Sequence, residues 1–223
     1  MCSLKLCGFK KFPDADDDIY GVINRPGGFE LTEQGIQLCG FPKSAGLMDI
    51  GCGSGATVRF LAQSCGFNVT GVDIAAEYAG TGSSWEIITA DAALLPFEEL
   101  TFDGGIFECS LSKIKDPNAA ISECHRVLKH GGKLLITDLY ARGEAAQLSG
   151  MLGRLENTDT ILGRVKRPGF KLLHIEDHSE VLRQMWAELI SDIGTDALYD
   201  GIGVDAAMLK RIRCGYYMAV LEK

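Results

Sequence analysis

Three aspartates stand where apolar runs of the chain end. Asp49 opens a glycine-rich turn, Asp73 ends a β-branched run, and Asp91 ends the apolar run after that. Glycines in such a turn let backbone N–H groups approach a ligand without interference from a β-carbon. Asp73 follows Gly51 by roughly 20 residues, the spacing at which an acidic side chain accepts hydrogen bonds from ribose hydroxyls. These residues predict a site for a nucleotide-like cofactor at strand ends.

The elements that must position these aspartates alternate between short apolar runs and amphipathic stretches. We expect strands at 47–50, 68–73, 85–91, 104–108, 133–140, 171–177 and 215–222. Apolar residues at helical spacing predict helices at 31–39, 58–65, 117–130 and 181–193, and a short one around 148–155. Alternation of strand and helix is typical of a parallel sheet covered on both faces.

The helix expected at 117–130 has the clearest start and stop signals in the sequence. Asp116 is suited to cap it, and Pro117 then takes the first helical position, where its missing N–H costs nothing. Gly131 and Gly132 follow the last apolar position and are predicted to end the helix, since glycine accepts positive φ.

Composition and charge limit the function classes. The net charge of −8 disfavours a large nucleic-acid footprint, because a negative surface repels phosphates. No run of the chain is long and apolar enough for a transmembrane helix, and Met1–Phe12 does not resemble a secretory signal, so we expect a cytoplasmic protein without a membrane partner. The eight cysteines form no Cys-x-x-Cys pair, so no structural metal site is expected.

As a set, these motifs resemble the class I S-adenosylmethionine-dependent methyltransferase family, in its small-molecule branch. The resemblance rests on segments 47–56, 71–74, 90–97, 102–103 and 126–134, and on the final strand. It implies contacts with S-adenosylmethionine: Asp49, Gly51, Cys52 and Gly53 for the methionine portion, Asp73 for the ribose, Ile74 for the adenine ring, and Asp91 and Ala92 for the adenine edge. One departure is the short stretch between Asp73 and Asp91, which predicts a shortened helix after the second strand.

The sequence specifies the residues near the methyl acceptor less clearly than those near the cofactor. Methyl transfer from a sulfonium needs alignment and exclusion of water more than a fixed catalytic group, although a general base can help. Glu108, at the end of the fourth expected strand, is a candidate for a base or a further cofactor contact. Tyr20 is a candidate for shielding the methyl group, and Arg25 for pairing with a carboxylate. His178 is a weaker candidate.

The resemblance implies a Rossmann-like, doubly wound α/β domain over residues 1–223, with seven strands in the order 3-2-1-4-5-7-6 and strand 7 antiparallel. A small helical cap, formed by 1–40 and 141–169, would shape the pocket for a small-molecule acceptor. The state of association is expected to be monomer or homodimer. Three alternatives stay open: a catalytically silent cofactor-binding protein, an RNA or protein methyltransferase, and an NAD-dependent oxidoreductase, against which Asp49 inside the turn argues.

Overall fold

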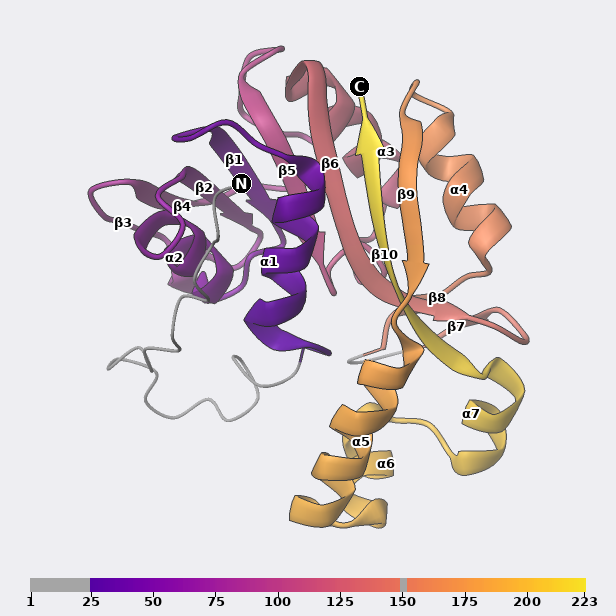
Figure 1. Ribbon diagram of the computed structural model, residues 1–223. Helices are drawn as coiled ribbons and strands as arrows, with labels where there is room; N and C mark the ends of the chain where they lie inside the picture. The colour runs from indigo at the N-terminus through magenta and orange to yellow at the C-terminus, as the bar shows by residue number, and fades with distance from the viewer. Residues whose placement is uncertain (1–24, 149–151) are drawn as a thin grey trace, which may run out of the picture.

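The computed structural model describes residues 25–148 and 152–223, and its centre is an eight-stranded sheet (Figure 1). The strands are β1 (Gly46–Ile50), β2 (Asn68–Asp73), β3 (Gly80–Thr81), β4 (Trp85–Thr89), β5 (Phe102–Glu108), β6 (Leu128–Ala141), β9 (Lys171–Asp177) and β10 (Cys214–Glu222). Their order is β3-β4-β2-β1-β5-β6-β10-β9. The five neighbouring strands β4, β2, β1, β5 and β6 pair in parallel. Strand β10 is antiparallel to both β6 and β9.

The predicted sheet is confirmed, with one addition. Apart from β3, the observed order is the expected 3-2-1-4-5-7-6, with the last strand of the chain antiparallel. The addition, β3, pairs antiparallel with β4 at the edge of the sheet. The helix expected to be short between β2 and β4 is reduced to one 3-10 turn, η1 (Ala76–Tyr78).

Helices cover both faces of the sheet (Figure 1). On one face, α1 (Gly28–Cys39) and α2 (Ala56–Gln63) pack with Leu47 and Ile106 in one buried cluster. On the other, α3 (Pro117–Val127) and α4 (Thr158–Lys166) pack with Met48 and Phe107 in a second. Neighbouring residues of β1 and β5 therefore pack on opposite faces of the sheet, which explains why both strands are buried along most of their length.

The predicted cap of α3 is confirmed, but its predicted end is wrong. Asp116 Oδ1 accepts the backbone N–H of Ala119 at 3.0 Å, and Pro117 opens the helix. The helix ends at Val127, and the chain passes directly into β6, where Leu128 is extended and pairs with Phe102. The two glycines expected to end the helix lie inside β6.

In the segment expected to hold a short helix around 148–155, the described residues 148 and 152–155 are not helical, and residues 154–155 pair in a hairpin instead. Strands β7 (Ala146–Gln147) and β8 (Arg154–Leu155) pair antiparallel, and the N–H of Arg154 donates to the carbonyl of Ser112 at 2.8 Å. The apolar residues Leu148, Leu152 and Leu155 are all buried, as the helix prediction required. Burial of the same residues is compatible with either structure, because short apolar runs do not distinguish helix from strand.

A larger helical insertion lies between β9 and β10. It consists of α5 (Ser179–Ile193), predicted at 181–193, followed by α6 (Thr195–Ile202) and α7 (Ala206–Ile212), which were not predicted. Because β9 and β6 are both antiparallel to β10, β9 runs parallel to β6 and delivers the insertion to the carboxyl edge of the sheet. Figure 1 shows these helices beyond that edge, below β9 and β10. Within the described ranges, no helix is long and apolar enough to cross a membrane.

Candidate functional site at the carboxyl edge of the sheet

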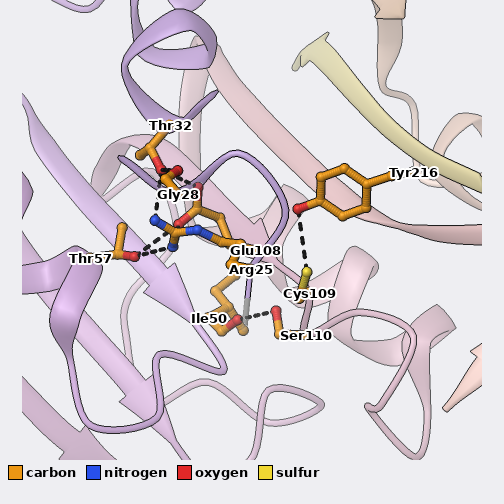
Figure 2. A network of polar contacts seen from close by, with 9 residues as sticks. All are labelled: Arg25, Gly28, Thr32, Ile50, Thr57, Glu108, Cys109, Ser110 and Tyr216. Carbon is orange, nitrogen blue, oxygen red and sulfur yellow. Dashed lines mark hydrogen bonds and ion pairs between the residues drawn. The ribbon is translucent and has the colours of Figure 1, made fainter. Parts of the chain in front are cut away.

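The turn after β1 passes directly against the end of β5. Gly51 has a φ of 75°, and a β-carbon there would lie 2.6 Å from that of Ser110. The Ser110 hydroxyl donates to the Ile50 carbonyl at 2.6 Å, which holds the two chain segments together (Figure 2). This close approach accounts for glycine at position 51, because any side chain would push the turn away from the sheet.

Asp73 ties the end of β2 to the same turn. Its Oδ2 accepts the N–H of Gly53 at 2.7 Å, and its Oδ1 accepts the N–H of Ala75 at 2.9 Å. Each carboxylate oxygen has further lone pairs, so the group can still accept bonds from a ligand. Gly53 has a φ of 52° and open space where a β-carbon would stand, so the turn offers bare backbone at this edge.

The end of β4 supplies the third predicted carboxylate. Asp91 is exposed, and its Oδ1 accepts the N–H of Ala93 at 2.9 Å, while Ala92 beside it is half-buried. Two large apolar side chains stand unusually open after β2 and β4: Ile74 is 75% exposed and Leu94 is 77% exposed. The edge therefore combines carboxylates with uncovered apolar surface, a combination suited to a flat ring with polar edges.

Glu108 lies in a buried polar cluster beneath α1 and α2, which we call the Arg25 cluster (Arg25, Thr32, Thr57 and Glu108; Figure 2). Its side chain is only 4% exposed. Oε1 accepts the hydroxyl of Thr32 at 2.7 Å, and Oε2 accepts the hydroxyl of Thr57 at 2.9 Å and an N–H of Arg25. The expectation that Arg25 pairs with a carboxylate is met by Glu108.

Asp49 stands beside this cluster and is 2% exposed. Burial, together with the neighbouring charge of Glu108, raises the pKa of Asp49 to about 8, while Arg25 acts in the opposite direction. No hydrogen-bond donor to the Asp49 carboxylate occurs among residues 25–148 and 152–223. A buried carboxyl group in this state is ready to ionise when a cation or donor approaches it.

Cys109 follows Glu108 and turns the chain at the end of β5. It has a φ of 51°, which a non-glycine residue seldom adopts, and its N–H donates to the Thr137 carbonyl at 2.8 Å. Its sulfur lies 3.3 Å from the hydroxyl of Tyr216 (Figure 2). Burial raises the pKa of Cys109 to about 12, so the thiol is neutral and poorly nucleophilic.

The structure brings together most of the residues singled out in the sequence. Asp49, Gly51, Cys52, Gly53, Asp73, Ile74, Asp91, Ala92 and Glu108 all lie at or beside the carboxyl ends of β1, β2, β4 and β5. Tyr20 lies outside the described residues. Thr32 and Thr57 were not predicted, because single threonines in amphipathic helices carry no signal that distinguishes them from surface residues. Within the described ranges, no group of three or more His, Cys, Asp or Glu side chains is arranged to hold a metal ion.

The fold is a Rossmann-like α/β fold, and the candidate site lies at the ends of β1, β2, β4 and β5, the edge at which ligands bind in open α/β sheets. Residues 48–136 match the family model described as "Methyltransferase domain". The chain is thus similar to this family of methyltransferase domains over residues 48–136.

Similar proteins agree with this assignment. The chain is 27% identical over 179 residues to phosphoethanolamine N-methyltransferase 3 of Arabidopsis thaliana, across 76% of this chain but only 34% of that protein. It therefore spans about a third of the length of this relative. Two solved structures share the fold: geranyl diphosphate C-methyltransferase of Streptomyces coelicolor A3(2) (TM-score 0.75, 15% identity, 87% of this chain and 80% of that one) and the [4+2]-cyclase SpnF (TM-score 0.69, 23% identity, 87% and 80%).

Proposed function

We propose that this protein binds S-adenosylmethionine and transfers its methyl group to a small molecule. The observation that carries the proposal is the row of carboxylates Asp49, Asp73 and Asp91 at the ends of three adjacent strands, around a turn whose glycines leave the backbone open. Asp73 and Gly53 are already bonded to each other, so ribose and amino-acid contacts would share one rigid support.

The residues present suit each part of this cofactor. The Asp73 carboxylate has lone pairs left for ribose hydroxyls, and the exposed Ile74 side chain offers an apolar surface for the adenine ring. Asp91 and Ala92 would bond the adenine edge. Gly51, Cys52 and Gly53 would enclose the methionine portion beside Asp49. The carboxylates also favour a ligand that carries a sulfonium and an ammonium charge.

The chemistry asked of the protein is alignment. In an in-line displacement, the acceptor's lone pair forms the new bond to the methyl carbon as the bond to sulfur breaks, and S-adenosylhomocysteine leaves. An acceptor with an O–H or N–H also loses a proton, to a side chain or to water. Both oxygens of Glu108 accept hydrogen bonds from the Arg25 cluster, so we assign Glu108 to holding the cofactor end of the site rather than to proton removal.

The acceptor is proposed to be a small molecule. The net charge of −8 argues against a nucleic-acid backbone. The helices α5 to α7 stand at the carboxyl edge, where a bound acceptor must approach the methyl group, and we propose that they form the main cap. The named relatives act on phosphoethanolamine or geranyl diphosphate, which are both small.

A second function has one observation in its favour. The fold is shared with a [4+2]-cyclase, so the fold alone does not establish methyl transfer. The decisive experiment incubates the full chain with methyl-labelled S-adenosylmethionine and fractionated metabolite extracts. Transfer of label into a small-molecule fraction supports the proposal. Tight cofactor binding with no labelled product from any extract would instead favour a protein that uses the bound cofactor without donating its methyl group.

A further inference from the structure

Strand β9 is a long open edge of the central sheet. Among the described residues it pairs only with β10, so the N–H and C=O groups along its outer side face no further strand (Figure 1). Five of its seven residues are exposed, whereas the opposite edge of the sheet, β3, has only two residues. Proteins commonly shorten or cover edge strands, because an open edge is a template for pairing with another chain. The length and exposure of β9 therefore make it the edge suited to accept another strand.

Two large apolar side chains of β9 are open to solvent. Leu173 is 43% exposed and Ile175 is 39% exposed. Leu173 is also the extra residue at a shift in register, so it has no opposite residue in β10. Such a shift bends an edge and can protect it, but it lies near the start of β9 and leaves 174–177 regularly paired. A strand that covers this edge must therefore bring apolar side chains to Leu173 and Ile175.

The two ends of β9 carry opposite charges. Exposed cations stand at its amino end: Lys166, Arg167 and Lys171. Exposed carboxylates stand at its carboxyl end and at the start of α5: Glu176, Asp177 and Glu180. A copy of β9 that ran parallel would bring like charges together, whereas an antiparallel copy brings each basic end to an acidic end. This complementarity favours a second copy of the same chain, related by a two-fold axis.

The pleat restricts the register of such a pair. Opposite residues must point to the same face of the sheet, so a single residue lies on the two-fold axis. With His174 on the axis, Leu173 lies opposite Ile175 of the second copy, and the contact occurs twice. With Ile175 on the axis, Leu173 would instead lie opposite Asp177, which places an apolar side chain beside a charge. The register centred on His174 is therefore the one that covers both exposed apolar side chains.

The same register brings two unlike charges together. Lys171 and Glu176 point to one face of the sheet, because the residues opposite them in β10, Glu222 and Met218, are an even number of positions apart. The extra residue at the register shift brings Lys171 opposite Glu176 of the second copy. The Glu176 side chain is 54% exposed and therefore accessible to this lysine.

We propose that this protein forms a two-fold symmetric homodimer by antiparallel pairing of β9 with β9 of a second copy, centred on His174. The two eight-stranded sheets then form one continuous sheet. Because β9 runs parallel to β6, toward the carboxyl edge, this pairing points the carboxyl edges of the two sheets in opposite directions. Each candidate site therefore belongs to one protomer alone, and the proposal is independent of the reaction at that site.

The first measurement is sedimentation equilibrium of the full chain and of variants at position 175. The native protein is expected at twice its chain mass of 24.1 kDa at micromolar concentration. Ile175→Lys places a charge opposite Leu173 of the second copy and should weaken the dimer by about 10-fold or more. Ile175→Val keeps the apolar contact and is the matched control, which should remain dimeric. A native protein that stays monomeric, or a dimer that Ile175→Lys leaves intact, would overturn the proposal.

A charge exchange tests the register. Lys171→Glu alone, or Glu176→Lys alone, puts like charges opposite each other at both contacts and should weaken the dimer by about 10-fold. An equimolar mixture of the two variants restores unlike charges at both contacts and should sediment as a heterodimer. Lys43→Glu, at an exposed position before β1, makes the same charge change away from β9 and should stay dimeric.

Thermal unfolding of each variant shows that it is folded before its mass is interpreted. Two folded variants that fail to associate when mixed would overturn the pairing around His174. If a charge variant does not fold, the mass of the native protein and of Ile175→Lys still decides whether β9 forms the interface.

Discussion

The carboxylate of Asp73 at the end of β2 accepts the backbone N–H of Gly53, 2.7 Å away in the turn after β1. This bond joins the two loops that the proposed cofactor would contact on either side. A second oxygen of the same carboxylate holds the N–H of Ala75, so the side chain has little freedom to rotate.

Substitution of Asp73 by alanine is expected to weaken binding of S-adenosylhomocysteine by about 10- to 100-fold, because it removes both the ribose acceptor and the support of the turn. Asp73→Asn keeps one acceptor oxygen and should lose less. Calorimetric titration measures both, with Asp159→Ala, in the first turn of α4, as the control. If Asp73→Ala bound S-adenosylhomocysteine as tightly as the native protein does, Asp73 would not be a cofactor contact.

Substitution of Gly51 by alanine is expected to destabilise the fold by about 1–3 kcal/mol, from the positive φ and from the clash with Ser110. Gly66 has a similar φ of 78° and open space around it, so Gly66→Ala measures the backbone contribution alone. Urea unfolding should show the larger loss for Gly51→Ala, and Ser110→Gly in the same chain should recover part of it. Equal losses at the two glycines would show that the close approach has no energetic weight.

The raised pKa of Asp49 predicts how stability varies with pH. The folded state holds this proton up to a pKa of about 8, whereas an unfolded aspartate loses it near 3.8. The folded state therefore binds more protons between these values, and the stability of the native protein should fall as pH rises through this range. Asp49→Asn removes this contribution, so the variant should gain stability relative to the native chain as pH rises from 5 to 8, by roughly 1 kcal/mol or more. Urea titrations at several pH values measure this difference, and a constant difference would contradict the assignment to Asp49.

The neutral thiol of Cys109 predicts that it has no covalent role. Since burial raises its pKa to about 12, Cys109→Ala should retain cofactor binding and labelled-methyl transfer within about threefold. Cys109→Gly relieves the positive φ and should be at least as stable as Cys109→Ala in thermal unfolding. Loss of methyl transfer in Cys109→Ala with cofactor binding intact would assign the thiol to the reaction instead.

Much of the fold was predictable because its signals are local. The β-branched run that becomes β2 and the capped start of α3 were located correctly, since strand propensity and Asp–Pro capping act over a few residues. The end of α3 was not, because the extended conformation of Leu128 is imposed by pairing with Phe102, a tertiary contact. The hairpin of β7 and β8 was mistaken for a helix for the same reason, since Ser112 holds Arg154 from a distant loop.

The candidate site also contains residues with local sequence signals and residues that are brought together only by tertiary contacts. The places of the aspartates and glycines at the carboxyl edge of the sheet could be predicted, because their positions after strands are visible in the sequence; their contacts with a cofactor stay a prediction. The two threonine partners of Glu108 could not be predicted, because Thr32 and Thr57 meet it only when α1 and α2 pack side by side over the sheet. The insertion α5 to α7 was only partly foreseen, since its place at the carboxyl edge follows from the direction of β9.

The most direct test of the central claim is calorimetric titration of the full chain with S-adenosylhomocysteine and, separately, with NAD. We expect saturable binding of S-adenosylhomocysteine in the micromolar range, and far weaker binding of NAD. Tighter binding of NAD, or no binding of S-adenosylhomocysteine, would contradict the central claim.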